Sequence, residues 1–163
     1  MKIADVITKM IVESNGNRRD LSHFLKVYAY AKIIGEAEGL DKKTQEILEV
    51  AAVIHDIACP LCREKYGSVA GPLQEAEGMI LAKTFLLAFD VDEAFAKRVI
   101  YLVGHHHTLD EINGLDYQIL IEADYLVNAD ESAYPEADIH EMMEQIFKTK
   151  TGTELLRSMY LAK

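Results

Sequence analysis

The sequence lacks several features that define whole classes of protein. Only 3 of its 163 residues are proline and 50% are hydrophobic, which excludes a disordered or low-complexity chain. Its apolar runs fall far short of the roughly 18–20 residues that span a bilayer, and its amphipathic N-terminus lacks the apolar run and cleavage site of a signal peptide. We therefore expect a cytoplasmic protein without a membrane partner, of a length that fits one domain with its own core.

Basic residues are also scarce. The chain has 17 Lys and Arg against 27 Asp and Glu, so its formal net charge is −10 at pH 7. Because nucleic-acid binding usually requires a basic surface, this balance excludes a nucleic-acid polymer as the main partner. A protein this acidic that binds a small phosphate ester needs a local positive centre, which a bound metal ion would supply.

Cysteine occurs only twice, as Cys59 and Cys62 in a C-x-x-C spacing. A redox motif of this spacing normally lies near a βαβ pattern, and a zinc ribbon needs a second pair of cysteines. Neither accompanies these residues. Ordinary loop cysteines are therefore the simplest interpretation, with a redox or a metal-binding role left open.

Period-two alternation of apolar residues is missing over any useful length, so we expect no strand. Apolar residues instead recur at helical spacing, and the prolines and glycines of 60–72 indicate a loop. The pattern predicts one all-α domain over 1–163, a helical bundle of seven to eight helices. The expected helices are 3–13, 21–38 with Asp20 as N-cap, one from Asp41 to Pro60, 72–88, one from Asp90 or Asp92 to about Gly104, 117–130, 136–150 and 153–162.

The most informative residues present are His55 and Asp56, side by side in the apolar stretch 51–57. Burying both is costly unless they are satisfied, and a divalent cation accepts both a neutral nitrogen and a charged oxygen. His23 and Asp124 also lie on apolar helical stripes. Alone, His23 would be a satisfied core histidine and Asp124 a paired buried acid. Together, the four residues predict a site for a divalent metal ion, with Mn, Fe, Ni, Co, Zn and Mg all compatible.

An early His, a His-Asp doublet after small apolar residues and a late Asp in an Ala-Asp context form a recognisable pattern. Here these are His23, His55-Asp56 and Ala123-Asp124. In this order the chain resembles the HD-domain superfamily of metal-dependent phosphohydrolases over about residues 20–130, with the C-terminal helices of 136–162 beyond it. The resemblance implies an all-α bundle that holds one or two divalent metals and hydrolyses nucleotides, phosphomonoesters, or cyclic or dinucleoside phosphates.

The resemblance also implies roles for residues. His23, His55, Asp56 and Asp124 would ligate the metal, which activates water for attack on phosphorus. Asp56 would in addition orient that water. Family members often place histidines after the fifth helix, where this chain has a run of three from 105 to 107. We expect His105 and His106 to act in catalysis, with a solvated histidine-rich loop as the alternative.

The chain departs from the family at two positions. Members with two metals usually carry a His where this chain has Gln74, and Glu75 could substitute for it. A single metal ion is therefore favoured over two. The position three residues after Asp56, often Lys or Glu, is Cys59, which argues against general acid chemistry there.

Four cations could bind a phosphate group: Lys26, Arg63, Lys65 and Arg98. Each is alternatively a surface charge. Arg63 and Lys65 are preferred, because they lie in the expected loop after the doublet and loops often carry specificity.

We therefore expect a divalent-metal-dependent phosphohydrolase that acts on a small phosphorylated metabolite or nucleotide. The substitutions at Cys59 and Gln74 keep open a non-catalytic regulatory module that binds a metal or a nucleotide on the same scaffold. A purely structural protein is disfavoured, since three helices would then bury unpaired His and Asp. The final segment, around Leu155 and Met159, either packs on the bundle or forms a homodimer contact, and the sequence leaves both open.

Overall fold

The computed structural model describes residues 1–161, and every regular element in this range is a helix. The absence of strands from the described residues confirms the all-α prediction. None of the helices in this range is both long and apolar enough to cross a membrane. In chain order the helices of residues 1–161 are α1 (Ile3–Glu13), α2 (Arg18–Ala37), α3 (Lys42–Ile54), α4 (Cys59–Tyr66), α5 (Gly71–Leu86), α6 (Glu93–Val103), α7 (Leu115–Glu131), α8 (Glu136–Gln145) and α9 (Lys150–Leu156), which continues as a short π-helix over Arg157–Leu161.

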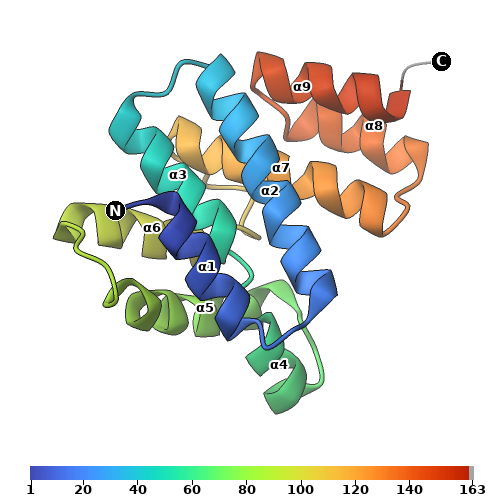
Figure 1. Cartoon of the computed structure of the whole chain (residues 1–163). Helices are drawn as coiled ribbons and strands as arrows, with labels where there is room; N and C mark the ends of the chain where they lie inside the picture. Colours follow the sequence, from blue (N-terminus) through green and yellow to red (C-terminus); the bar gives the residue numbers. More distant parts are fainter. Residues whose placement is uncertain (162–163) are drawn as a thin grey trace.

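Three helices, α2, α3 and α7, pack on one another at the centre of the bundle (Figure 1). Every residue of α3 from 47 to 54 and of α7 from 116 to 127 is buried. Helices that are covered on all sides belong to the interior of a protein. Polar residues on these two helices therefore lie in the core and need partners there.

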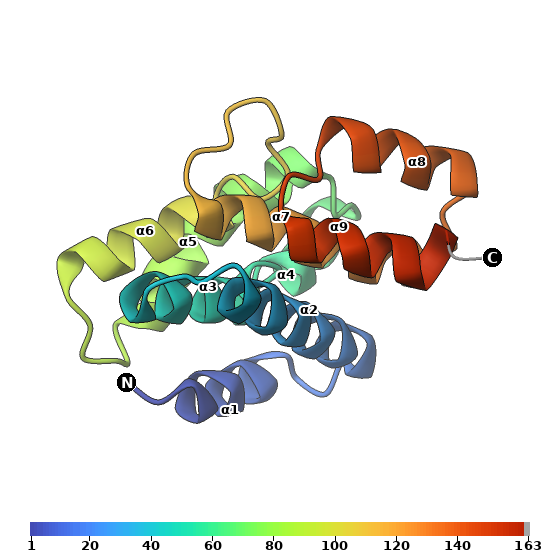
Figure 2. The same ribbon diagram turned by 90° about the horizontal axis from the view of Figure 1, so that it is seen from above.

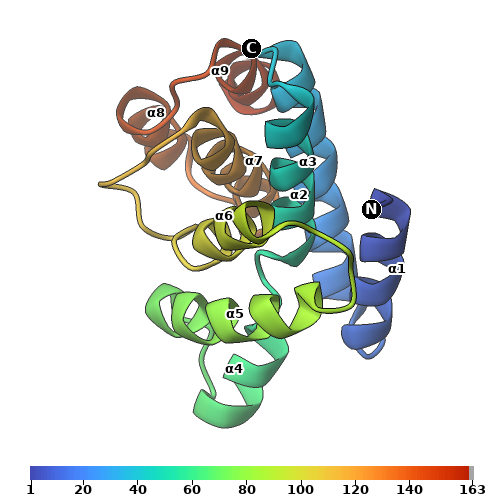
Figure 3. The same ribbon diagram turned by 90° about the vertical axis from the view of Figure 1, so that its left-hand side faces the viewer.

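The remaining helices cover this centre from different sides. Figures 1 and 3 show α8 and α9 together at one end of the molecule and α4 with α5 at the opposite end. Helix α1 packs on α3 and lies on the side away from α8 (Figure 2). The hydroxyl of Tyr160 donates to the carbonyl of Leu126, 2.5 Å away, and Leu156 is fully buried. The final segment, as far as residue 161, therefore packs on the bundle.

Helix starts follow capping side chains. Asp41 accepts hydrogen bonds from the backbone N–H groups of Lys43 and Thr44 and caps α3 as predicted. The cap of α2 is Asn17, whose side chain accepts from the N–H groups at positions 19 and 20, and not the predicted Asp20. The earlier start adds a turn to α2, which places Arg19 on the helix four residues before His23.

Helix α4 occupies a segment that we predicted to be a loop. Pro60 lies in its first turn, where a missing N–H leaves no helical bond unmade, and Gly67 ends it with a φ of 63°. The residues that indicated a loop are thus the start and stop of a helix, and the described residues hold nine α-helices instead of seven or eight. As a further difference, α3 ends at Ile54, so His55 and Asp56 stand at a break between helices and not inside one.

Candidate metal centre

The structure brings four predicted ligand residues together from three parts of the bundle. His23 comes from α2, His55 and Asp56 from the end of α3, and Asp124 from α7. The Nε2 atom of His23 lies 3.2 Å from Nε2 of His55 and 3.1 Å from Oδ1 of Asp124. Oδ2 of Asp56 lies 3.5 Å from the first of these nitrogens and 3.7 Å from the second.

The hydrogen bonds of the other ring nitrogens define which atoms are free to bind. Nδ1 of His55 donates to the carbonyl of Ala52 at 2.8 Å, and Nδ1 of His23 donates to Oε2 of Glu131 at 2.9 Å. A neutral imidazole that donates through Nδ1 presents a lone pair at Nε2. In these neutral tautomers, the lone pairs at Nε2 of His23 and His55 therefore face the carboxylate oxygens, and all of these atoms can bind a cation.

A cation fits this arrangement of acceptors. Ligand atoms bonded to one ion at about 2.0–2.2 Å are separated by roughly 2.9–3.5 Å when their bonds are about 90–110° apart. Nε2 of His23 lies 3.2 Å from Nε2 of His55, 3.1 Å from Oδ1 of Asp124 and 3.5 Å from Oδ2 of Asp56, and these three separations match this range. The separation between Nε2 of His55 and Oδ2 of Asp56 is slightly longer, at 3.7 Å. Two imidazole nitrogens with two carboxylates suit a first-row divalent metal.

The charges in the cluster favour the same conclusion. Burial opposes a charge on His23, but its hydrogen bond to Asp124 and the charge of Asp56 raise the pKa of His23 to about 9, so a proton occupies Nε2 until a metal cation displaces it. Burial likewise opposes ionisation of Asp56, yet the neighbouring His55 and His106 hold its pKa below the usual range. Hydrogen bonds from His23 and His55 lower the pKa of Asp124 against the effect of its burial. The cluster keeps two carboxylates charged and attracts positive charge.

A second set of ligand atoms adjoins the first. Atoms of Asp56, His106 and His107 lie within 4.8 Å of one another. His106 donates through Nδ1 to the carbonyl of Val103, and its buried Nε2, 3.4 Å from Oδ1 of Asp56, has no hydrogen-bond partner. Because Asp56 belongs to both sets, the structure offers ligand atoms for two ions, and not only for the single ion that the sequence favoured.

Only one of the two histidines that we expected to act in catalysis reaches this cluster. His105 donates through Nδ1 to the carbonyl of Tyr101 and stacks on the Tyr101 ring, with centroids 4.1 Å apart. His106 and His107 face the cluster in its place. Burial and the adjacent His106 lower the pKa of His107 to about 4, so its ring is neutral and able to bind a cation.

The structure also separates the candidate phosphate-binding cations. Arg63 lines a cavity of about 360 Å³ together with His23, Asp56 and Asp124, and it pairs there with Asp20. We refer to this space as the arginine cavity. Arg19, which sequence reasoning missed, lines the same cavity, and its spacing of four residues from His23 on α2 is the signal that would have found it.

The other three cations are held elsewhere by acids. Lys65 pairs with Glu77 at 2.6 Å and lines neither cavity beside the cluster. Lys26 pairs with Glu131 at 3.1 Å. Arg98 contacts both oxygens of Asp116, at 2.6 and 2.8 Å.

Two supporting residues on α7 were also absent from the sequence prediction. Asn128 donates to Oδ1 of Asp124 at 2.9 Å, and Glu131 accepts from His23. They follow Asp124 by four and seven residues, the spacing of one helical face. That periodicity was available in the sequence, but it does not distinguish partners of a ligand from surface acids.

Cys59 and Gln74, the two positions where the sequence departs from the family pattern, form a hydrogen bond with each other. The thiol of Cys59 donates to Oε1 of Gln74 at 3.1 Å, and burial raises the pKa of the Cys59 thiol. Glu75 does not reach the cluster in place of the missing histidine. Its Oε1 accepts from the backbone N–H of His107 and from the hydroxyl of Thr108, both at 3.0 Å.

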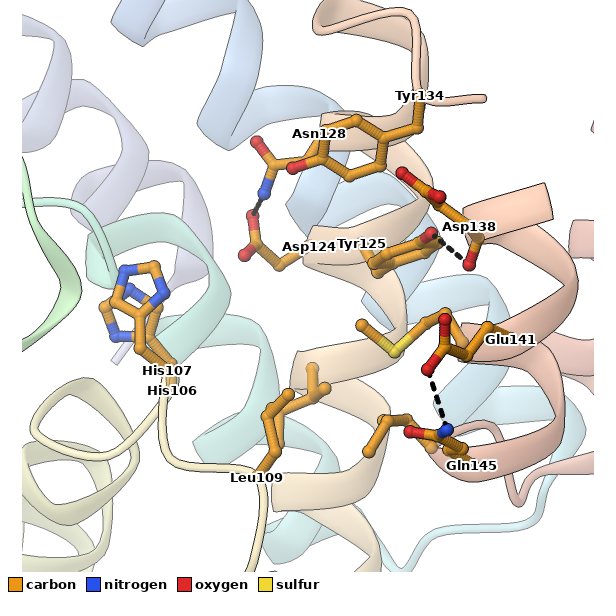
Figure 4. A pocket seen from close by; sticks show the side chains of 13 residues that line it. His106, His107, Leu109, Asp124, Tyr125, Asn128, Tyr134, Asp138, Glu141 and Gln145 are labelled. Carbon is orange, nitrogen blue, oxygen red and sulfur yellow. Dashed lines mark hydrogen bonds between the residues drawn. The ribbon is translucent and has the colours of Figure 1, made fainter. Parts of the chain in front are cut away.

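A larger cavity of about 560 Å³ opens on the other side of the cluster, between the histidine run, α7 and α8. We refer to it as the α7–α8 cavity. Figure 4 shows His106 and His107 across this cavity from Asp124, with Asp138, Glu141 and Gln145 on the side formed by α8. It shares His107, Asp124 and Asn128 with the arginine cavity, so the two spaces meet at the cluster.

Comparison with known proteins agrees with this geometry. No curated protein matches the chain. A crystal structure of a predicted HD superfamily hydrolase from an uncultured Thermotogales bacterium is similar with a TM-score of 0.67 and 24% identity, over 98% of this chain and 83% of that chain, which is a likeness of fold. The family model of the HD domain matches residues 20–134, the part of the chain that carries all four predicted ligand residues. The resemblance seen in the sequence is thereby confirmed, and this chain belongs to the HD domain family.

Proposed function

We propose that this protein is a divalent-metal-dependent phosphohydrolase that acts on a small phosphorylated metabolite or nucleotide. One observation carries the proposal. Three histidines donate through Nδ1 and aim Nε2 at two carboxylates, so atoms that can ligate a cation converge from separate helices. Under the proposal His23, His55, Asp56 and Asp124 hold one ion, and His106 and His107 share Asp56 with them for a second.

A divalent ion in such a site supplies Lewis acidity, which polarises a phosphoryl oxygen and lowers the pKa of water. The residues of the chain bind and orient the reactants around it. Arg63 and Arg19 line the arginine cavity and can neutralise the charge on the phosphate oxygens. In the reaction the bond between phosphorus and the ester oxygen breaks, a water oxygen bonds to phosphorus, and the alcohol leaves with a proton.

Under the proposal, two residues transfer protons. Asp56 directs Oδ2 towards His23 and His55 and Oδ1 towards His106, so its carboxylate can accept a hydrogen bond from the attacking water. His106 is buried, and when no second ion is bound, its unpartnered Nε2 can hold a proton for the departing oxygen. His105, which stacks on Tyr101, has no part in this scheme.

A second candidate is a regulatory module that binds a metal or a nucleotide without turnover. The observation that favours it is the hydrogen bond between Cys59 and Gln74, which lies in the arginine cavity where a reactive side chain would act. Neither residue can donate a strongly acidic proton. Such a module would be stabilised by its ligand and would form no product.

Metal content and activity together test the proposal. The full chain, purified without a histidine tag, is analysed for metal beside His55→Ala and Asp56→Ala. We expect bound divalent metal and phosphate release from simple phosphomonoesters in the wild type, and at least a hundredfold loss of activity with loss of metal in both variants. Helical circular dichroism should remain, because the substituted residues stand at a break between helices.

His140→Ala is the matched control, since His140 is exposed on α8 and lies in neither ligand set. It should retain metal and activity. Full activity in metal-free Asp56→Ala would refute the proposal. Metal binding with no product from any ester would favour the regulatory module instead.

A further inference from the structure

The α7–α8 cavity has a lining that differs in charge from that of the arginine cavity. Among the residues described by the structure, no Lys or Arg lines it, whereas Arg19 and Arg63 line the other space. Two carboxylates outside the cluster, those of Asp138 and Glu141, stand on its α8 side. Both belong to exposed residues, and Glu141 accepts a hydrogen bond from Gln145 at 2.9 Å. A second negative charge on a ligand would be repelled here and a positive one attracted.

The cavity also offers apolar and aromatic surface. The rings of Tyr125 and Tyr134 lie with centroids 5.5 Å apart at one side, and Ile121 and Met142 add aliphatic surface. A volume of about 560 Å³ lies within the range of about 300–1,000 Å³ that is typical of sites for small molecules. Away from the cluster, the lining therefore suits a flat organic group.

The two cavities meet at the cluster, so a substrate bound there could extend into both. Asp124 and His107 line both, and the buried, unpartnered Nε2 of His106 belongs to a residue that lines the α7–α8 cavity. A phosphate group at the cluster has arginines on one side only. The organic part of the ester then extends to the other side, along α7 and α8.

We propose that the α7–α8 cavity binds the alcohol part of the substrate, and that Asp138 and Glu141 select alcohols that are neutral or carry an amine over those with a second negative charge. This inference rests on the proposed function and names its substrate class: phosphomonoesters of aromatic or apolar alcohols without a further acidic group. Glu141 and Asp138 act as specificity-determining residues, away from the reacting atoms.

Three aryl phosphates of similar size test the inference, namely O-phosphotyramine, 4-ethylphenyl phosphate and 4-(carboxymethyl)phenyl phosphate. They differ mainly in carrying a positive charge, no charge or a negative charge at the far end. With the metal-loaded full chain at low salt, we expect kcat/KM to be roughly tenfold higher for the amine than for the carboxylate, with the neutral ester between them. The ratio should shrink as salt is added.

Substitutions on α8 locate the origin of this preference. Glu141→Lys should abolish or reverse the ratio between amine and carboxylate. Glu144→Lys makes the same change of charge on the same helix but outside the lining, and it should leave the ratio within about twofold of wild type. Equal kcat/KM for the three esters, or equal effects of the two substitutions, would overturn the inference while the proposed function stands.

A binding measurement separates failure of the inference from failure of the proposed function. If no ester is hydrolysed, the proposed function fails, but tyramine and 4-hydroxyphenylacetate can still be titrated into the protein and followed by NMR. Preferential shifts of Tyr125 and Tyr134 signals by tyramine, lost in Glu141→Lys, would support the cavity as an alcohol site. Equal binding of both compounds, or none of either, would overturn it.

Discussion

Each histidine of the cluster is oriented by the ring nitrogen that faces away from it. His55 and His106 donate to backbone carbonyls one turn earlier, which no substitution of a side chain can remove. His23 differs because its partner is a side chain, the carboxylate of Glu131. Such partners hold the tautomer and orientation of a ligand and raise its basicity. The position of Glu131 is therefore where a single substitution can weaken the site without touching a ligand.

Replacement of Glu131 by Gln should lower the affinity for a divalent metal by about 10–100-fold. The amide can still accept from Nδ1 of His23, so the ring keeps its place but loses the adjacent negative charge. Competition with a fluorescent chelator measures the change. Asp130→Asn, at the neighbouring exposed position, is the control and should leave the affinity within about twofold. Equal affinities in the two variants would contradict the supporting role of Glu131.

At the level of helices, one buried carboxylate on the central helix α7 connects it to the start of the C-terminal helix α9. Glu122 on α7 is fully buried and accepts from the N–H groups of Lys148 and Thr149, at 2.7 and 3.0 Å, at the start of α9. It also accepts from the hydroxyl of Thr149 and the side chain of Gln118. N–H groups at the start of a helix have no partner within it, so Glu122 satisfies groups that would otherwise be buried and unpaired. Two residues after Glu122 on the same helix stands Asp124.

Glu122→Gln should lower the free energy of unfolding by about 2–3 kcal/mol. The substitution removes hydrogen bonds to a charged acceptor and turns an amide N–H towards the donors of α9. Urea denaturation followed by circular dichroism measures the loss as a lower midpoint. Glu144→Gln, on the exposed side of α8, should change stability by less than about 0.5 kcal/mol. A midpoint for Glu122→Gln equal to that of the control would show that α9 is held by its apolar contacts alone.

At the scale of the whole molecule, the cluster joins the three central helices. His23 and Asp124 are 101 positions apart in the chain and meet within hydrogen-bond distance. The carboxylates of Asp56 and Asp124 repel each other there, since the charge of Asp124 opposes ionisation of Asp56. A cation bound between them would remove this repulsion, and the folded protein alone would bind it, because the predicted ligands come from separate helices.

Metal binding should therefore stabilise the protein against heat. At a free metal concentration of about 100 times Kd, linkage adds about 2.7 kcal/mol, which corresponds to a rise in Tm of about 5–10 °C for a chain of this size. Thermal unfolding in Mn²⁺ or Zn²⁺ and in excess chelator measures the difference. Asp56→Ala should melt at the same temperature under both conditions. A metal-dependent rise that persists in this variant would place the ion elsewhere.

Several features of the molecule could be predicted from local sequence. The helical class follows from the spacing of apolar residues, and the cap at Asp41 follows from a side chain that bonds within one turn. For α6 the sequence offered Asp90 or Asp92, and the structure has Asp92 as the cap. Helix α4 was missed because a proline followed by a glycine is typical both of a loop and of the two ends of a short helix, as Pro60 and Gly67 are here. The residue types themselves, His and Asp on apolar stripes, were enough to predict which four side chains the fold brings together, since such groups are not buried without a partner.

Other parts depended on contacts between distant segments. Which rings of the histidine run face the cluster depends on contacts with other segments. Glu75 accepts a hydrogen bond from the backbone of His107, and Tyr101 stacks on His105. The cations could not be assigned from sequence, because each long side chain can reach any acid on a surface rich in carboxylates, as Lys65 reaches Glu77. The sequence by itself determined the helical class, the ligand types and the family, since these depend on local periodicity and on the cost of burying polar groups. Only the tertiary structure decided which histidines and arginines surround the ligands, and where the two cavities lie, because these depend on how separate helices pack.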